Sequence, residues 1–65
     1  MKKGDLVTFS AYGKARVYNK DIIPNTHGIV IKSIRPNTDL ESCNVMWFPA
    51  MEVRYHWRTE VKFLK

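Results

Sequence analysis

Apolar residues in this chain alternate with polar ones in short runs, and this pattern restricts the folds open to it. The five runs are DLVTF (5–9), HGIVIKSI (27–34), SCNVMWF (42–48), EVRYHW (52–57) and VKFLK (61–65). Alternation puts successive side chains on opposite faces of a strand, and no stretch sustains the 3.6-residue period of a helix. The sequence therefore predicts an all-β protein with five antiparallel strands.

The length of the chain limits how many apolar residues can be spared for binding. Its 65 residues form a single predicted domain, 1–65. A domain of this size buries only about 60% of the surface that the unfolded chain exposes, so most large apolar side chains must help to form the core. The segment between the first two runs, SAYGKARVYNKDIIPNT, is too apolar to be disordered and too irregular for one strand. We expect a long, partly ordered loop there.

Proline-containing turns separate the later runs. The tripeptide Pro-Asn-Thr occurs at 24–26 and again at 36–38, each time next to an apolar or β-branched run. In the second copy, Pro36 suits the second position of a turn and Asn37 tolerates left-handed backbone. This chemistry predicts a hairpin between the second and third runs.

Pro49 marks a second hairpin, and the length of its turn decides which side chains share a face. Proline cannot supply the positive φ that two-residue turns need, which favours a three-residue turn, 49–51. The core face then holds Cys43, Val45, Trp47, Val53, Tyr55 and Trp57, and the solvent face holds Asn44, Met46, Phe48, Glu52, Arg54 and His56. A slip of one residue would invert this assignment and put Trp47 beside Arg54 and His56.

Basic residues concentrate toward both ends of the chain. The formal net charge is +5, with five lysines and arginines against Asp5 in residues 1–20 and four against Glu60 in residues 53–65. Residues 21–52 carry more acidic than basic side chains. If the fold brings the ends together, they form one basic side; the alternative is that the charge only keeps the protein dispersed.

The order of motifs resembles small SH3-like β-barrels, including KOW-type modules and the short single-domain barrels that tailed phages encode. The matching pieces are Lys3-Gly4-Asp5 before the strand LVTF, a long connection, Gly28-Ile29-Val30, Val45 and Trp47 two apart, and Trp57-Arg58-Thr59-Glu60-Val61 before a short last strand. The resemblance implies a five-stranded antiparallel SH3-like barrel with a long first loop and one 3₁₀ turn before the last strand. It also implies a binding or scaffolding module, since such barrels rarely catalyse reactions by themselves.

Neighbouring first and last strands, which the resemblance implies, would gather the basic ends. The resulting patch would contain Lys2, Lys3, Lys62 and Lys65, with Lys14, Arg16 and Lys20 beside it on the long loop.

Catalytic and metal-binding patterns are weak. His27, Cys43 and His56 lack the paired spacing of a zinc site, and the carboxylates are scattered. In the favoured register Cys43 points inward and His56 outward, which separates a nucleophile from its base. We expect no enzyme activity, no metal, no cofactor and no small-molecule substrate.

Two kinds of partner remain. The first is a protein or a second copy of the chain, held by a patch near Met46 and Phe48 and by the long 10–27 loop. The alternative is nucleic acid, contacted by a basic face with interleaved aromatic rings. The candidate binding residues are Tyr12, Lys14, Arg16, Tyr18, Met46, Phe48, Arg54, His56 and Arg58.

The predicted setting is the cytoplasm. No apolar run has the length of a signal peptide or a membrane span, and Cys43 has no second cysteine with which to form a disulfide. The resemblance to phage barrels adds an infected bacterial host as one possible setting.

Overall fold

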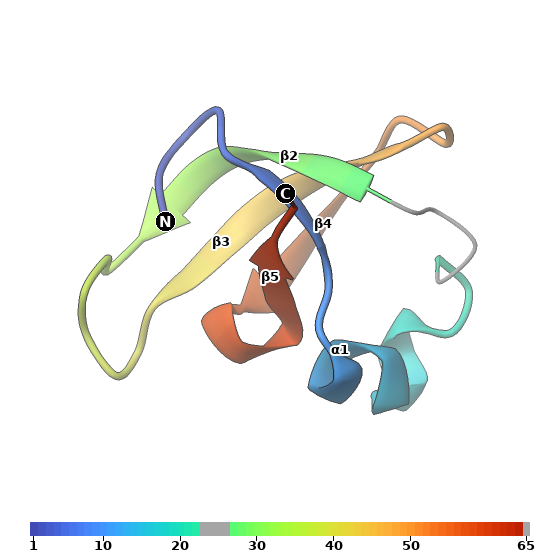
Figure 1. The fold of residues 1–65 in the computed structure, drawn as a ribbon, viewed down its shortest axis with the longest axis horizontal. Helices are drawn as coiled ribbons and strands as arrows, with labels where there is room; N and C mark the ends of the chain where they lie inside the picture. The colour runs from blue at the N-terminus through green and yellow to red at the C-terminus, as the bar shows by residue number, and fades with distance from the viewer. Residues whose placement is uncertain (23–26, 65) are drawn as a thin grey trace.

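The computed structural model describes residues 1–22 and 27–64. They form one curved antiparallel sheet, with short helices gathered at one end of the molecule (Figure 1). The strands are β1 (Leu6–Phe9), β2 (His27–Ile34), β3 (Ser42–Phe48), β4 (Glu52–Trp57) and β5 (Val61–Phe63), in the spatial order β4-β3-β2-β1-β5. The helices are α1 (Ala11–Ala15) and two 3₁₀ turns, η1 (Val17–Asn19) and η2 (Arg58–Glu60). The predicted all-β class and its five antiparallel strands are confirmed.

The sheet is open, with β4 and β5 as its two edges, but it bends strongly over itself. In Figure 1, β1 and β5 pass in front of β3 and β4. The rings of Phe9 on β1 and Trp47 on β3 stack with centroids 4.2 Å apart, although β2 lies between their strands. An irregularity in the β2–β3 pairing between Val30 and Lys32 contributes to the bend, because a bulge increases local twist.

The core fills the concave side of the bent sheet. Its buried apolar residues are Val7, Phe9, Ile22, Val30, Cys43, Val45, Trp47 and Val61. Gly28 is needed for this packing, because a Cβ atom there would lie 2.5 Å from Val45 Cγ1 and 2.9 Å from the Trp47 ring. A glycine at this point of β2 therefore lets the strand lie directly against the central tryptophan.

The segment after β1 is more ordered than the predicted loop, because local caps form α1 and η1. The Ser10 hydroxyl accepts a hydrogen bond from the Gly13 amide (3.0 Å) and donates one to the Thr59 carbonyl (2.6 Å). Gly13 lies so close to the Glu60 carbonyl that any Cβ would clash with it. The structure therefore has α1 and η1 in addition to the predicted 3₁₀ turn before the last strand. Residues 23–26, with the predicted turn at 24–26, lie outside the described part of the chain.

Two predicted features are present: the 3₁₀ turn before the last strand and the hairpin turn at Pro36-Asn37. The 3₁₀ turn η2 precedes β5, and β5 pairs with β1. Asn37 adopts the left-handed conformation with φ of 63°, and Arg35 does so as well, with φ of 50°. The chemistry of the Pro36-Asn37 turn was therefore readable from the sequence.

The predicted β3–β4 register is wrong by one residue. Trp47 pairs with Glu52, Val45 with Arg54, and Cys43 with His56. Beyond the last β3–β4 pair, Trp47 and Glu52, the chain turns through a cis Phe48–Pro49 peptide and Met51 at φ of 58°, so a non-glycine residue supplies the left-handed position.

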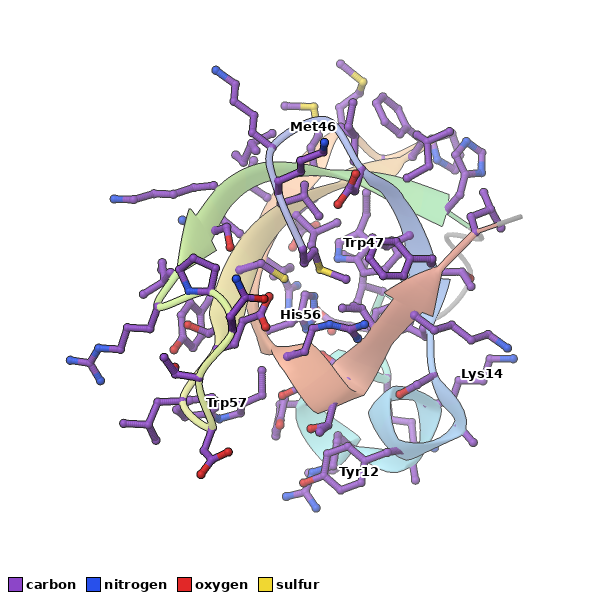
Figure 2. All side chains as sticks on the ribbon, turned by 60° about the vertical axis from the view of Figure 1, so that its left-hand side comes forward. Tyr12, Lys14, Met46, Trp47, His56 and Trp57 are labelled. Atoms are coloured by element: carbon purple, nitrogen blue, oxygen red, sulfur yellow. The ribbon has the colours of Figure 1, made fainter. Side chains whose placement is uncertain are left out.

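The slip inverts the faces of β4, as a one-residue shift must. Val53, Tyr55 and Trp57, expected in the core, are 46%, 52% and 45% exposed. His56, expected in solvent, is buried, and Figure 2 shows it beside Trp47 inside the sheet. Glu52 and Arg54 also lie on the inner side, where they are partly buried.

No helix in residues 1–22 and 27–64 combines the length and apolar character needed to cross a membrane.

The two tryptophans give a matched test of the fold. Trp47→Ala removes a fully buried ring and should lower the free energy of unfolding by on the order of 3–5 kcal/mol. Trp57→Ala removes a ring that contacts Tyr55 at the surface and should cost about 1 kcal/mol or less. Urea denaturation followed by circular dichroism measures both, and equal losses would contradict the observed register.

Candidate interaction surface

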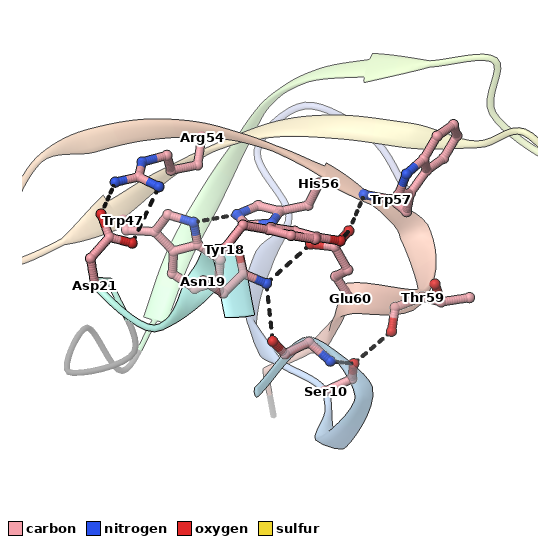
Figure 3. A network of polar contacts seen from close by, with 11 residues as sticks. Ser10, Tyr18, Asn19, Asp21, Trp47, Arg54, His56, Trp57, Thr59 and Glu60 are labelled. Carbon is pink, nitrogen blue, oxygen red and sulfur yellow. Dashed lines mark hydrogen bonds and ion pairs between the residues drawn. The ribbon is translucent and has the colours of Figure 1, made fainter. Parts of the chain in front are cut away.

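A chain of buried hydrogen bonds links the core to the helical segment through His56 (Figure 3). The Trp47 indole N–H donates to His56 Nε2 over 2.9 Å. Because Nε2 accepts, the proton of the neutral imidazole resides on Nδ1, which lies 2.9 Å from Glu60 Oε1 and donates to it. Burial lowers the pKa of His56, against the opposing effect of Glu60. The ring is therefore held neutral in one tautomer.

The Glu60 carboxylate accepts hydrogen bonds from two elements, β4 and η1. Besides His56, it accepts from the Tyr18 hydroxyl (2.7 Å), the Asn19 side-chain amide (3.1 Å) and the backbone N–H of Trp57 (3.3 Å). Burial acts to raise the pKa of Glu60, but these hydrogen bonds outweigh it and the pKa lies below its usual value. The buried carboxylate is thus ionised and fixes η1 and β4 against η2.

Cys43 faces His56 across the β3–β4 ladder, but the pair is not arranged for nucleophilic chemistry. The predicted inward position of Cys43 is confirmed, whereas the expectation that His56 lies outside is wrong. Burial raises the pKa of the Cys43 thiol to about 11, and both ring nitrogens of His56 already have partners. In the described ranges, no three His, Cys, Asp or Glu residues are grouped so that they could hold a metal ion.

Four of the predicted binding residues lie together on the helical segment. Tyr12, Lys14, Arg16 and Tyr18 are all exposed on or beside α1 and η1. The Arg16 guanidinium lies 5.3 Å from the Tyr12 ring centroid and 5.4 Å from that of Tyr18. In Figure 2, Tyr12 and Lys14 lie at the end of the molecule opposite Met46, so the predicted residues form two separate groups.

Two arginines of the predicted binding site, Arg54 and Arg58, already have partners within the fold. Arg54 forms ion pairs with Glu52 and with Asp21, the latter at 2.5 Å. The hydrogen bond from Arg54 lowers the pKa of Asp21. Arg58 donates to the Val61 carbonyl (2.9 Å) and lies over the Phe63 ring. A phosphate would have to compete with these contacts.

The convex side of the sheet, called the outer face below, carries an apolar row that crosses four strands. Leu6 on β1 pairs with Ile29, Ile29 with Met46, and Met46 with Val53 on β4. Paired residues share a face of the sheet, so these four side chains form one continuous strip. Leu6 and Val53, at the two ends of the strip, are both large and exposed. Met46 was predicted to be an exposed apolar residue, and it lies in the middle of the row, half-buried.

Aromatic side chains extend this strip along β4. The Tyr55 and Trp57 rings meet edge to face with centroids 5.9 Å apart. On the far side of Met46, the rings of Phe48 and His27 stack at 5.7 Å. The outward positions of β1 to β4 are Leu6, Thr8, His27, Ile29, Lys32, Ile34, Ser42, Asn44, Met46, Phe48, Val53, Tyr55 and Trp57. None of these is a carboxylate, and Lys32 is the only lysine or arginine among them.

The predicted site lacked five residues of the apolar row and its extension along β4: Leu6, Ile29, Val53, Tyr55 and Trp57. The alternation in EVRYHW did group Val53 with Tyr55 and Trp57 correctly. It gave no indication of which group faces solvent, because the partners that bury His56 come from distant segments. The sequence thus showed that Val53, Tyr55 and Trp57 share one face of β4. The observed β3–β4 register was needed to show that this face is the outer one.

The basic ends meet in part. β1 and β5 are neighbours, and Lys2, Lys3 and Lys62 are exposed. Lys65, the remaining member of the predicted basic patch, lies outside the described residues.

Comparisons of the chain with protein-family models, curated proteins and solved structures found no match. The functional argument therefore depends on the geometry above.

The contribution of Tyr18 to the buried network can be tested against Tyr12. Tyr18→Phe removes the hydroxyl that donates to Glu60 and leaves the ring beside Arg16, so the urea midpoint should fall. Tyr12→Phe also keeps a ring beside Arg16 and should leave the midpoint unchanged. An equal effect of both changes would show that the hydroxyl bond to Glu60 does not stabilise the fold.

Stability should decrease on acidification in two steps. Burial lowers the pKa of His56 from its ordinary 6.5, so the unfolded chain takes up this proton first and stability falls as the pH drops below about 6.5. The pKa of Glu60 is also lowered in the folded state, so its stabilisation, present above about 4.5, is lost as the pH falls further. Urea denaturation between pH 8 and pH 2 measures both steps.

His56→Gln supplies the control for the first step. Its amide can accept from Trp47 and donate to Glu60 but does not titrate, so the loss below pH 6.5 should disappear. A pH profile that keeps this step in the variant would assign it to another group.

Proposed function

We propose that this protein is a non-catalytic interaction module that binds a protein partner through the outer face of its sheet. The observation that carries the proposal is the apolar row Leu6–Ile29–Met46–Val53, continued along β4 by the exposed rings of Tyr55 and Trp57. Contiguous apolar surface of this kind marks interaction sites in small proteins, because leaving it in water is unfavourable.

The chemistry of the outer face favours a protein over nucleic acid. Lys32 is the single lysine or arginine among the outward positions of β1 to β4. Arg54 and Arg58 are occupied by ion pairs, a backbone carbonyl and an aromatic ring. Tryptophan and tyrosine are enriched among the residues that dominate protein interfaces, which makes Trp57 and Tyr55 the expected anchors.

The buried network supports this role by making the platform rigid. Trp47, His56 and Glu60 hold β3, β4 and η2 in one arrangement, and Glu60 also binds η1 through Tyr18 and Asn19. A preorganised surface loses less conformational entropy when it binds. The long first connection, η2 before β5 and the β1–β5 pairing support the resemblance to SH3-like barrels, which we keep as part of the proposal.

Nucleic acid is the second candidate, and a specific observation favours it. The net charge is +5, and no outward position of β1 to β4 carries a carboxylate that would repel phosphates. Exposed rings such as Trp57 can stack on the bases of a single strand.

Photo-crosslinking tests the favoured function with a matched control. A benzophenone amino acid replaces Tyr55 on the outer face or Tyr12 on α1, two positions of nearly equal exposure, 52% and 51%. In the expressing cell, position 55 should yield crosslinked protein and position 12 should not. Crosslinks from position 12 alone would assign binding to the helical segment instead.

Titration with fluorescent oligothymidylate tests the second candidate. For a protein-binding module, anisotropy should remain flat at low salt. Binding whose log affinity falls with log salt, at a slope of about −0.7 per phosphate contact, would favour the nucleic-acid function. Trp57→Ala should then weaken that binding by about 1–3 kcal/mol without changing the slope, because stacking releases no counterions.

A further inference from the structure

The two edges of the sheet differ in how they are protected. β5 is a three-residue strand with Lys62 at its centre, and both features discourage pairing with another chain. β4 has six residues, Glu52 to Trp57, and contains neither proline nor lysine. Its pairing with β3 is continuous, without a bulge that would twist the edge away. Proline, lysine and bulges, which protect many long edges, are thus missing from β4, and its charged residues, Glu52 and Arg54, are ion-paired with each other and with Asp21.

In the described ranges, β4 has β3 as its only strand neighbour. The backbone–backbone hydrogen bonds outside the ladders include none from residues 52–57, and of these residues Trp57, at the end of the strand, donates its backbone N–H to Glu60 Oε2. The side chains that border this edge on the outer face, Val53, Tyr55 and Trp57, are large and exposed. The edge therefore combines open backbone groups with apolar side chains, which are the two requirements for strand addition.

We propose that the occupant of this edge is a second copy of the chain, paired antiparallel along β4 about a twofold axis at Tyr55. Two identical edges related by such an axis make a closed, symmetric interface. This inference rests on the proposed function, since it names the partner for the β4 part of the outer face.

The side chains of β4 select the register. Residues that pair directly lie on the same side of a sheet, so the outer faces of two copies align only when outward residues pair with outward residues. Centring on Tyr55 pairs the two Tyr55 rings and puts Val53 opposite Trp57 of the second copy, twice. These are aromatic and aromatic–β-branched pairs, which stabilise sheets.

Neighbouring registers are worse. A register centred on Arg54 puts this residue opposite its own copy and leaves Trp57 opposite Met51 in the turn. One centred on His56 puts Arg54 opposite Arg58 and leaves Val53 opposite Thr59, beyond the strand. Like charges directly opposite each other destabilise a sheet. In the Tyr55 register Glu52 lies opposite Arg58, and Arg54 lies opposite the neutral His56.

Sizing by light scattering with a matched pair of variants tests the pairing. The wild-type mass should rise toward that of a dimer with increasing concentration. Tyr55→Lys puts two lysines together at the axis and should weaken the dimer about a hundredfold, roughly tenfold from each copy. Leu6→Lys introduces the same charge at an equally exposed outer-face position on β1, far from the edge, and should leave the dimer intact. Circular dichroism verifies that both variants are folded.

Two further experiments fix the register. An equimolar mixture of Tyr55→Lys and Tyr55→Glu should restore the dimer, because opposite charges then meet at the axis. Tyr55→Cys should form an intermolecular disulfide on mild oxidation, whereas Val53→Cys should do so only when mixed with Trp57→Cys. The native Cys43 is buried and does not compete.

Several outcomes would overturn the proposal. A wild-type chain that stays monomeric at every concentration excludes the dimer. A dimer broken by Leu6→Lys as readily as by Tyr55→Lys would indicate face-to-face packing of outer faces. If the protein is monomeric but position 55 still crosslinks another protein, the proposed function stands and the dimer alone is refuted.

Discussion

The hydrogen bond between the Trp47 indole and His56 is the contact on which the rest of this structure depends. It requires both side chains to project from the same face of the β3–β4 hairpin, and so it matches the observed register and excludes the one with a shorter turn. The same imidazole donates a hydrogen bond from its Nδ1–H to the Glu60 carboxylate, which also accepts hydrogen bonds from Tyr18 and Asn19 of the helical segment. One tautomer of one buried histidine thus connects the sheet, η2 and η1.

Burying these polar groups is favourable only because each one has a partner. An unpaired carboxylate or imidazole in this core would cost several kcal/mol, a large share of the stability of a small domain. The network therefore favours one β3–β4 register over the alternatives. Any register that separates Trp47 from His56, or His56 from Glu60, leaves a buried donor or acceptor without a hydrogen-bond partner. The apolar contacts of Trp47 with Phe9 and Gly28 add packing around the same centre.

The outer face follows directly from this arrangement. Because His56 and Arg54 take inward positions on β4, the alternation of the strand sends Val53, Tyr55 and Trp57 outward. A small protein thereby exposes its second tryptophan and a tyrosine beside an apolar row, although it has few large side chains to spare. Exposing this much apolar surface costs stability unless a partner covers it, and this is the physical basis for assigning the surface to binding.

The sequence alone determined the all-β class, all five strands to within two residues at their ends and the turn at Pro36-Asn37, and the resemblance to SH3-like barrels added the 3₁₀ turn before β5. These features depend on local chemistry: alternation, turn residues and the interruption of apolar runs. It also placed Trp47 in the core. The tertiary structure alone decided the face of each β4 residue, the order in the segment after β1 and the location of the candidate site. Those choices depend on partners far apart in the chain, since Trp47, His56, Glu60 and Tyr18 come from four different elements. A polar residue such as His56 is predicted to be exposed, because the alternation within its own strand does not show that Trp47 and Glu60 will be its buried hydrogen-bond partners.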